Sequence, residues 1–352
     1  MVSNHSYSYC NIQDWAQPAL ASCHVLKWIG GYLCFVFLSG IVFNGIILII
    51  HLENRKRRSP IEIFILALCL SNLTATILGI PLPLTSNLAC RWLYGKYLCY
   101  YEGFVAYFVG MVGLYLLTSL SLNRYWMIVT PHREYFLTFQ TAYISVILSV
   151  LGGLFWAAAP IFGWNDYTLE GVLTSCSICW QARTVNVISY NVAMFIFAYV
   201  LPLFIMAYCN ICIYLKVREV TRMKALRFVQ RHISKTYCKR QTMERHIAKS
   251  VFLIIFGFTV AWTPYAIAAF ISSFLSPTLI SPLGGTLPAI FAKSSIYFNP
   301  LIYIISNSHI RSKVFSRRTP FRNSDVSIPV KVPYQLANTP LKSQIVVNNS
   351  SK

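Results

Sequence analysis

One lysine lies in the middle of an apolar stretch that is long enough to cross a membrane. Lys293 falls within the last apolar run of the chain, residues 283–305, at a depth near the centre of a bilayer. A lysine there is disfavoured by about 2.5–3.5 kcal/mol on insertion scales, so its presence indicates a function and a charged partner. Desolvation disfavours its charged form, and a neutral amine can attack a carbonyl to form a Schiff base. The alternative is a lysine that snorkels or forms an ion pair in a helix bundle without chemistry.

The third apolar run contains an acid that could be the partner of this amine. Glu102 lies one helical turn inward from Cys99, where an uncompensated carboxylate is costly. Lys293 is the only candidate cation in a neighbouring span, and an opposite charge favours the protonated form of its nitrogen. Glu170 follows the fourth span, in a segment that suits a short hairpin over the mouth of a bundle. If Cys176 of that hairpin were tied to Cys99, Glu170 would be a second acid near the pocket.

Composition indicates that these residues belong to a membrane protein. The 352 residues are 56% hydrophobic and only 11% charged, which is too apolar for a soluble globular domain. A span needs about 20 apolar residues to cross the hydrocarbon core. Seven such segments cover residues 28–50, 61–84, 98–129, 142–162, 188–215, 248–274 and 283–305. The sequence therefore predicts an all-α membrane protein, a seven-transmembrane helix bundle.

The distribution of basic residues predicts the orientation of the bundle. The formal net charge is +20, which by itself could suggest a nucleic-acid partner. The basic residues, however, cluster on one side of the spans, at residues 55–58, 133, 216–249 and from 311 onward. The other side carries only Lys27, Arg91, Lys96 and Arg183. This positive-inside bias excludes the nucleic-acid interpretation and predicts an outside amino terminus and a cytoplasmic carboxyl terminus in a multi-pass protein of the cell membrane.

The segments outside the spans divide the chain further. We predict an extracellular segment over residues 1–27, the bundle over 28–306, an amphipathic inner-surface helix over 307–316, and a disordered cytoplasmic tail over 317–352. The first residues lack a signal-peptide pattern, so we expect the first span to direct insertion. Asn4 begins a glycosylation sequon on the outer side. The predicted outer side also carries six cysteines that can form disulfides, Cys10, Cys23, Cys90, Cys99, Cys176 and Cys179. No spacing is typical of a zinc site, so we predict no metal.

Aromatic residues in the sixth span favour a ligand pocket over ordinary core packing. Phe258, Trp262 and Tyr265 follow one another at helical spacing beside Pro264. Such aromatics more often belong to a core, but a kinking proline and a lysine in the next span both favour the pocket. Asn44, Asn72 and Asn299 are amides inside three spans. They either hold helices together or form one polar network that rearranges.

Four motifs in the right order resemble those of a known family. Lys293 lies six residues before Asn299-Pro300-Leu301-Ile302-Tyr303, and Glu170 lies six residues before Cys176. The third span begins Cys99-Tyr100-Tyr101-Glu102-Gly103-Phe104, and the sixth contains Trp262-Thr263-Pro264-Tyr265. The chain resembles animal opsins, the retinal-binding branch of rhodopsin-like G-protein-coupled receptors, over residues 28–315.

This resemblance implies a chromophore site. It implies a light-activated receptor, not an enzyme, that holds retinal on Lys293 as a protonated Schiff base, 11-cis in the dark and all-trans after light. It implies Glu102 or Glu170 as the counterion and a Cys99–Cys176 disulfide. The implied retinal pocket includes Gly110, Phe258, Trp262, Tyr265 and Ala292.

The resemblance also implies an activation switch and cytoplasmic partners. The switch residues are Asn123, Arg124, Tyr125, Glu244, Asn299, Pro300 and Tyr303. We expect a heterotrimeric G protein at the inner cavity, arrestin and a receptor kinase at the serine- and threonine-bearing tail, and membrane lipid around the spans. Four features depart from the family pattern: Asn123 in place of the acid before the arginine, Asn72 in place of an aspartate, Asn210 in place of a tyrosine, and the tripeptide Asn307-Ser308-His309. Together they suggest an invertebrate or nonvisual opsin with raised basal activity, because the local ion pair to Arg124 is missing.

Three other functions are compatible with parts of this pattern. A retinal photoisomerase of similar fold would use the same lysine, although the Asn299–Tyr303 motif and the basic inner loops favour signalling. A receptor for a diffusible ligand would not need Lys293. A transporter or proton pump would show more acids along a path than Glu62 and Glu102.

Overall fold

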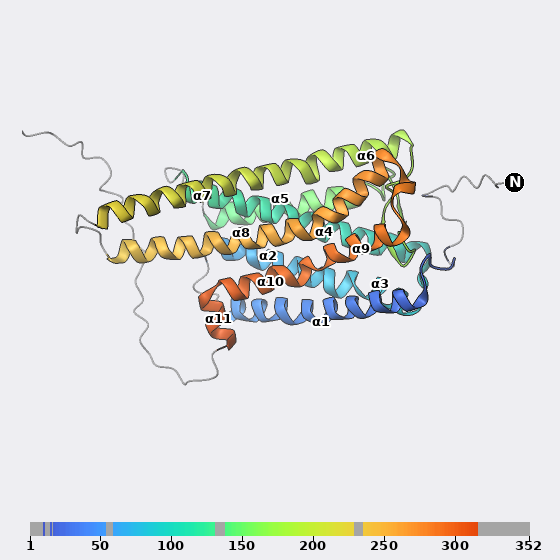
Figure 1. Cartoon of the computed structure of the whole chain (residues 1–352), viewed down its shortest axis with the longest axis horizontal. Coiled ribbons are helices and arrows are strands. Elements are labelled where there is room, and N and C mark those ends of the chain that lie inside the picture. Colours follow the sequence, from blue (N-terminus) through green and yellow to red (C-terminus); the bar gives the residue numbers. More distant parts are fainter. Residues whose placement is uncertain are drawn as a thin grey trace, which may run out of the picture. The chain divides into compact units, whose positions relative to one another are not determined.

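The computed structural model describes residues 10, 15, 17–53, 59–130, 138–228 and 235–315, and it leaves out the side chains of residues 221–247, 308–309 and 315. In this part of the chain, long helices run side by side and form one bundle (Figure 1). Asn4, the side chain of Glu244 and the expected tail over residues 317–352 lie outside the described residues.

Six candidate membrane spans lie within the described residues, each helical, long and apolar enough to cross a membrane. Three of them are single helices, α1 (Cys23–Glu53), α4 (Gly95–Ile128) and α5 (Phe139–Ala158). The second span consists of α2 (Pro60–Thr74), a π-helical turn and α3 (Pro81–Leu88). The fifth consists of α6 (Val185–Phe195), a π-helical turn and α7 (Leu201–Phe228), and the sixth contains α8 (Lys235–Phe270). Pro81 begins α3 because a proline lacks the N–H group that a continuous helix requires.

The seventh span is divided into two shorter helices. α9 (Pro282–Lys293) and α10 (Ser295–Ser306) each contain 12 residues and are separated by Ser294. Neither helix alone could cross a membrane, but together they cover the predicted last span. α11 (Ser308–Phe315) follows directly. The protein is a seven-helix bundle, as the sequence predicts, and Lys293 lies at the division in the last span.

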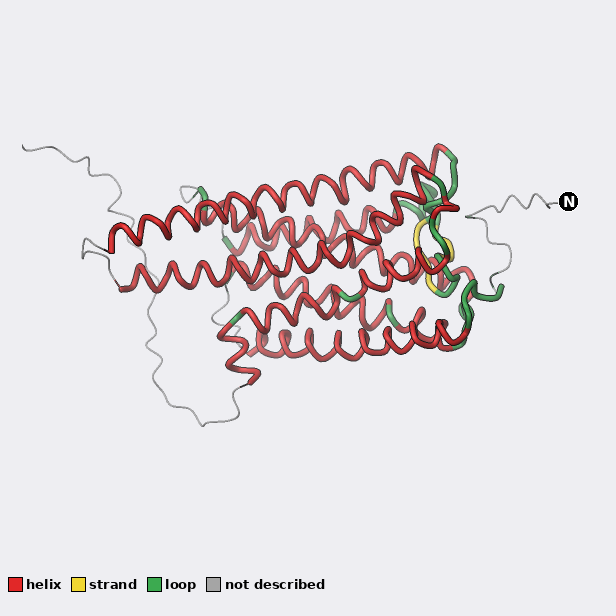
Figure 2. Tube along the Cα trace, viewed as in Figure 1, coloured by secondary structure: helices red, strands yellow, loops and turns green. Residues whose placement is uncertain are grey.

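A short hairpin closes one end of the bundle, which we call the hairpin end (Figure 2). Strands β1 (Tyr167–Glu170) and β2 (Ser175–Ile178) pair antiparallel, with Glu170 opposite Ser175. Gly171 begins the turn with a φ of +57°, and a Cβ atom there would lie 2.1 Å from the Thr286 hydroxyl of α9. Glycine therefore allows the turn to contact α9, where the Val172 N–H donates to the same hydroxyl at 2.9 Å.

Residues before α1 are attached to the hairpin. The Leu20 N–H donates to the Val172 carbonyl at 3.1 Å, and Pro18 forms an isolated bridge with Arg91. Two disulfides, Cys10–Cys179 and Cys23–Cys90, connect this segment to the end of the hairpin and to the end of α3. Backbone and covalent contacts therefore hold residues 17–23 against the hairpin end.

The outward side of the bundle is apolar. Leu148, Phe204 and Ile211 are among the large apolar side chains that lie more than half exposed. Such exposure is costly in water but favourable in lipid. Together with the spans, it identifies a multi-pass membrane protein.

Candidate functional site: a lysine in an apolar cavity

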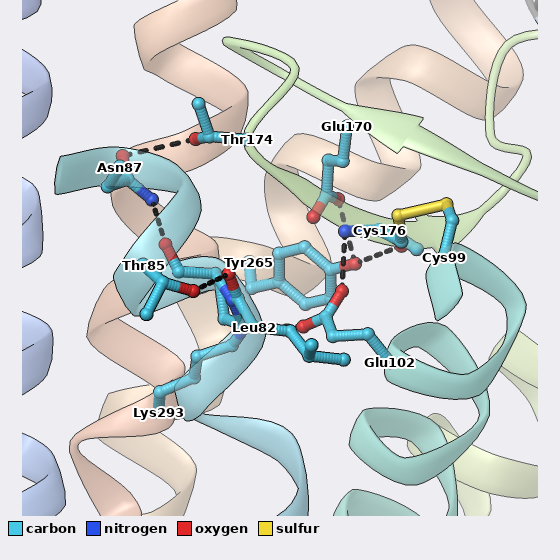
Figure 3. A network of polar contacts seen from close by, with 12 residues as sticks. Leu82, Thr85, Asn87, Cys99, Glu102, Glu170, Thr174, Cys176, Tyr265 and Lys293 are labelled. Atoms are coloured by element: carbon cyan, nitrogen blue, oxygen red, sulfur yellow. Dashed lines mark hydrogen bonds and ion pairs between the residues drawn. A yellow bond between two sulfur atoms is a disulfide. The ribbon is translucent and has the colours of Figure 1, made fainter. Parts of the chain in front are cut away.

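The lysine and the acid that the sequence singled out are paired. The Lys293 amine lies 3.1 Å from Glu102 Oε1, and the Glu102 side chain, from α4, is fully buried. Figure 3 shows both side chains next to the hairpin. The Cys176 N–H donates to Glu102 Oε2 at 2.5 Å. A Cys99–Cys176 disulfide joins β2 to α4 one turn from Glu102, so it holds that donor in place.

Both residues of this ion pair line a large apolar cavity. The cavity has a volume of about 130 Å³, whereas a single water molecule requires roughly 10–15 Å³ on the same scale. The cavity therefore has room for a sizeable ligand. Its walls include every residue of the predicted pocket and both candidate counterions, namely Glu102, Gly110, Glu170, Phe258, Trp262, Tyr265 and Ala292, with Lys293.

Glu170 lies in the same cavity but has a different partner. Its Oε1 accepts a hydrogen bond of 2.9 Å from the Tyr265 hydroxyl, and no ion pair to it lies within 4.0 Å in the described part of the chain. Burial raises the pKa of the Glu170 carboxyl to about 7, although the Tyr265 hydroxyl and the Lys293 charge act in the opposite direction. The two acids therefore differ: Glu102 is paired with the lysine, whereas Glu170 is bonded to Tyr265 and has a pKa raised by burial.

Trp262 lines the cavity and lies against α4. A Cβ atom on Gly110 would lie 2.7 Å from Trp262 Cη2, so the glycine is what allows the indole to approach α4. The indole N–H donates to the Ser295 hydroxyl at 3.1 Å, two residues after Lys293. Trp262 thus contacts the cavity, α4 and the lysine-bearing span at once.

Several cavity residues were not predicted from the sequence. Ser177 and Trp180 surround the Tyr265 hydroxyl at 2.8 and 3.3 Å. Tyr107 lines the cavity, and its buried hydroxyl has no hydrogen bond of normal geometry among the described residues. Tyr107 lies five residues after Glu102, off the helical face that carries the acid. The only sequence signal for Tyr107 is the polar hydroxyl group that a tyrosine places within an apolar span.

The predicted switch residues lie toward the opposite end of the bundle and do not all meet. Arg124 is fully buried, and Asn123 donates to the Ser119 carbonyl of its own helix at 2.8 Å. Tyr125 contacts the ring of Tyr208 on α7, with centroids 5.9 Å apart. The expected partner Glu244 has no described side chain, so its contact with Arg124 stays a prediction.

The polar network expected from three asparagines connects two of them. Asn72 donates to Asn44 at 3.2 Å, and Asn44 donates to the Ile296 carbonyl of α10 at 3.0 Å. Asn299 is buried beside Pro300, with its Oδ1 lacking a partner among the described residues. Tyr303 packs against His51, with ring centroids 6.2 Å apart. Asn44 therefore contacts the seventh span through the backbone carbonyl of Ile296 and not through the Asn299 side chain.

Comparison with known proteins assigns this arrangement to a family. A model of the 7 transmembrane receptor (rhodopsin family) matches residues 43–303. The chain belongs to the rhodopsin family of seven-transmembrane receptors. It is 29% identical to a Gq-coupled rhodopsin of Mizuhopecten yessoensis, over 86% of this chain and 62% of that protein. It is 30% identical to human melanopsin, over 82% of this chain and 61% of that protein.

A solved structure supports the same family. The crystal structure of squid rhodopsin matches with a TM-score of 0.76 and 27% identity, over 86% of this chain and 91% of that one. The chain spans less than two thirds of the Gq-coupled rhodopsin and of melanopsin, and 80% of a G0-coupled rhodopsin of Mizuhopecten yessoensis to which it is 29% identical. The similar proteins are opsins, and this chain is an animal opsin.

Proposed function

We propose that this opsin is a light-activated receptor that binds retinal through Lys293 and signals to a heterotrimeric G protein. The observation that carries the proposal is one amine inside an apolar cavity, paired with a fully buried carboxylate. The residues fit retinal because they offer an amine in the wall of an otherwise mainly apolar cavity. When bound, retinal would supply an aldehyde for a Schiff base and a double bond that light isomerises from 11-cis to all-trans.

The chain's own groups have distinct parts in this proposal. Glu102 keeps a proton on the Lys293 nitrogen, because the buried carboxylate stabilises its positive charge. The hairpin covers the cavity and limits access of water to that nitrogen. Because Trp262 lines the cavity, a bound ligand that changes shape would displace its ring. Pro264 in α8 is the point where the helix can bend. In the structure, the lysine amine stands in for the Schiff-base nitrogen.

The opposite end of the bundle is the proposed signalling side. The buried Arg124 and the expected acid Glu244 would form a pair that opens when α8 moves, admitting the G protein. Two similar proteins are named as Gq-coupled and G0-coupled rhodopsins, which supports a G-protein partner without choosing its class. We place the amino terminus outside and the tail in the cytoplasm of the cell membrane, with arrestin and a receptor kinase acting on that tail. The boundaries 1–27, 28–306, 307–316 and 317–352 remain part of this proposal.

An absorption spectrum of the purified protein with 11-cis-retinal, before and after illumination, tests the assignment. We expect a visible band that light changes, and its loss in Lys293→Ala. The matched control Lys27→Ala, outside the cavity, should keep the band. Light-dependent GTP exchange on added G protein should follow the pigment. Absence of any band in the unsubstituted protein would overturn the proposal and favour a diffusible ligand, whereas a pigment that isomerises retinal without GTP exchange would favour a photoisomerase.

A further inference from the structure

The backbone next to Lys293 departs from regular helix. Lys293 is the last residue of α9, and Ser294 separates it from α10. The Ser294 N–H donates to the Phe291 carbonyl at 3.0 Å, three residues back instead of four, which is the tighter pattern of a helix end. The direction of the lysine side chain therefore depends on the backbone at a division in the span, where the regular pattern of helical hydrogen bonds is interrupted.

Two side chains from other helices hold this division. The Ser294 hydroxyl is fully buried and hydrogen-bonded to the Tyr32 hydroxyl of α1. The Ser295 hydroxyl accepts from the Trp262 indole of α8 and donates to the Ala292 carbonyl at 2.8 Å. Each of the two residues after Lys293 is thus attached to a different neighbouring helix.

Helix α1 is itself firmly anchored at the level of Tyr32. Its first residue, Cys23, is disulfide-bonded to Cys90. A Cβ atom on Gly30 would lie 2.8 Å from Leu88 Cδ2, so α1 and α3 are in close contact there. On the other side of Tyr32, the Phe35 ring meets the Tyr297 ring edge to face, with centroids 5.3 Å apart. The Tyr32 hydroxyl is therefore a fixed point against which Ser294 is held.

We propose that Tyr32 is a positioning residue for Lys293. Its hydrogen bond to Ser294 holds the backbone between α9 and α10 in place. This orients the Lys293 side chain so that its amine lies next to Glu102. The inference rests on the proposed function and assigns a residue to the same site. Removal of the Tyr32 hydroxyl leaves the buried Ser294 hydroxyl without this partner, and the turn carrying Lys293 gains freedom. The amine then spends less time against Glu102 and more time open to reagents.

The first test uses the protein without retinal. Reductive methylation with formaldehyde and cyanoborohydride labels neutral amines, and peptide mass spectrometry gives the rate at Lys293 relative to Lys96. Tyr32→Phe and Ser294→Ala should each raise that ratio by up to about tenfold, the factor expected from one lost hydrogen bond. The double variant should exceed neither single one, because both remove the same contact. Tyr97→Phe, on a ring that is 88% exposed, is the matched control and should leave the ratio unchanged.

The second test uses the retinal-loaded protein. A carboxylate that lies farther from the Schiff-base nitrogen stabilises the ground-state charge less, so Tyr32→Phe and Ser294→Ala should move the visible band to longer wavelength. A general loss of stability would lower the unfolding temperature without moving the band. Failure of the unsubstituted protein to form a pigment would refute the proposed function, while the methylation ratios would still test the positioning. Unchanged ratios in both variants, or additive effects in the double variant, would refute the role of Tyr32.

Discussion

The Cys176 N–H donates a hydrogen bond of 2.5 Å to the Glu102 carboxylate. The other oxygen of the same carboxylate lies 3.1 Å from the Lys293 amine. One buried group therefore connects the hairpin, α4 and the lysine-bearing span. The Cys99–Cys176 disulfide keeps this donor at the acid, so the hairpin is part of the charge site as well as its cover.

The first prediction concerns which acid balances the lysine. Glu102→Gln keeps the size of the side chain but removes its charge, so the Schiff-base nitrogen loses the charge that holds its proton. We expect the visible band to move to the ultraviolet at neutral pH in this variant. Glu170→Gln is the matched control, and its band should stay in the visible. Absorption spectra of both pigments decide, and the reverse pattern would make Glu170 the counterion.

The second prediction concerns the pH dependence of stability without retinal. Burial raises the pKa of Glu170 from 4.5 to about 7, so between these values the folded protein binds a proton that the unfolded chain has released. The contribution of Glu170 to stability should therefore be greatest below about pH 4.5, fall as the pH rises toward 7, and level off above it. A shift of this size corresponds to roughly 3 kcal/mol.

Thermal unfolding of the unsubstituted protein and of Glu170→Gln across this pH range isolates the effect. Glutamine resembles the protonated acid and does not titrate, so the variant should lack this part of the decline. Equal slopes in the two proteins would show that Glu170 is already ionised in the fold.

The sequence was sufficient for the features that depend on composition and spacing. Apolar runs of membrane length predict the spans, and an isolated charge in such a run needs a partner, which distinguishes Lys293 and Glu102. The proline beside Trp262 and Tyr265, one span before the lysine, predicts that these aromatics line a pocket. These inferences need only helical periodicity and the cost of a buried charge.

Other features depend on contacts that the sequence does not display. The division at Ser294 involves no proline or glycine at that position, and its contact with Tyr32 joins residues 262 positions apart. The family resemblance implies the Cys99–Cys176 disulfide, but the other four predicted outer cysteines still allow three pairings from sequence alone, and the fold distinguishes these. Tyr107 looks like any other core aromatic until the cavity beside it is known.

The third prediction concerns the glycines of α4. A Cβ atom at Gly110 would meet the Trp262 ring at 2.7 Å, whereas one at Gly113 would find its nearest neighbour, Phe258, at 3.6 Å. Gly110→Ala should therefore displace Trp262 and destabilise the dark state by about 1–3 kcal/mol, the usual cost of overpacking. We expect a lower unfolding temperature and raised GTP exchange in the dark.

Gly113→Ala is the matched control, since it adds the same methyl group to the same helix at ordinary contact distance. It should unfold at the same temperature as the unsubstituted protein or slightly higher, because alanine favours helix. Equal behaviour of the two variants would mean that Trp262 moves aside without cost.

The fourth prediction concerns the disulfide that anchors α1. Cys23 and Cys90 are 67 residues apart and bonded, with Cα atoms 5.1 Å from each other. Cys90→Ser should therefore free the Cys23 thiol for alkylation under non-reducing conditions, and mass spectrometry should find the label there. The variant should also unfold at lower temperature. A disulfide that closes a loop of this length lowers the entropy of the unfolded chain, which adds at most about 4 kcal/mol to the free energy of unfolding. Cys34→Ser, at a cysteine without a disulfide, is the control for a lost thiol. A label at Cys10 or Cys179 in place of Cys23 would show that the cysteines at the hairpin end pair differently.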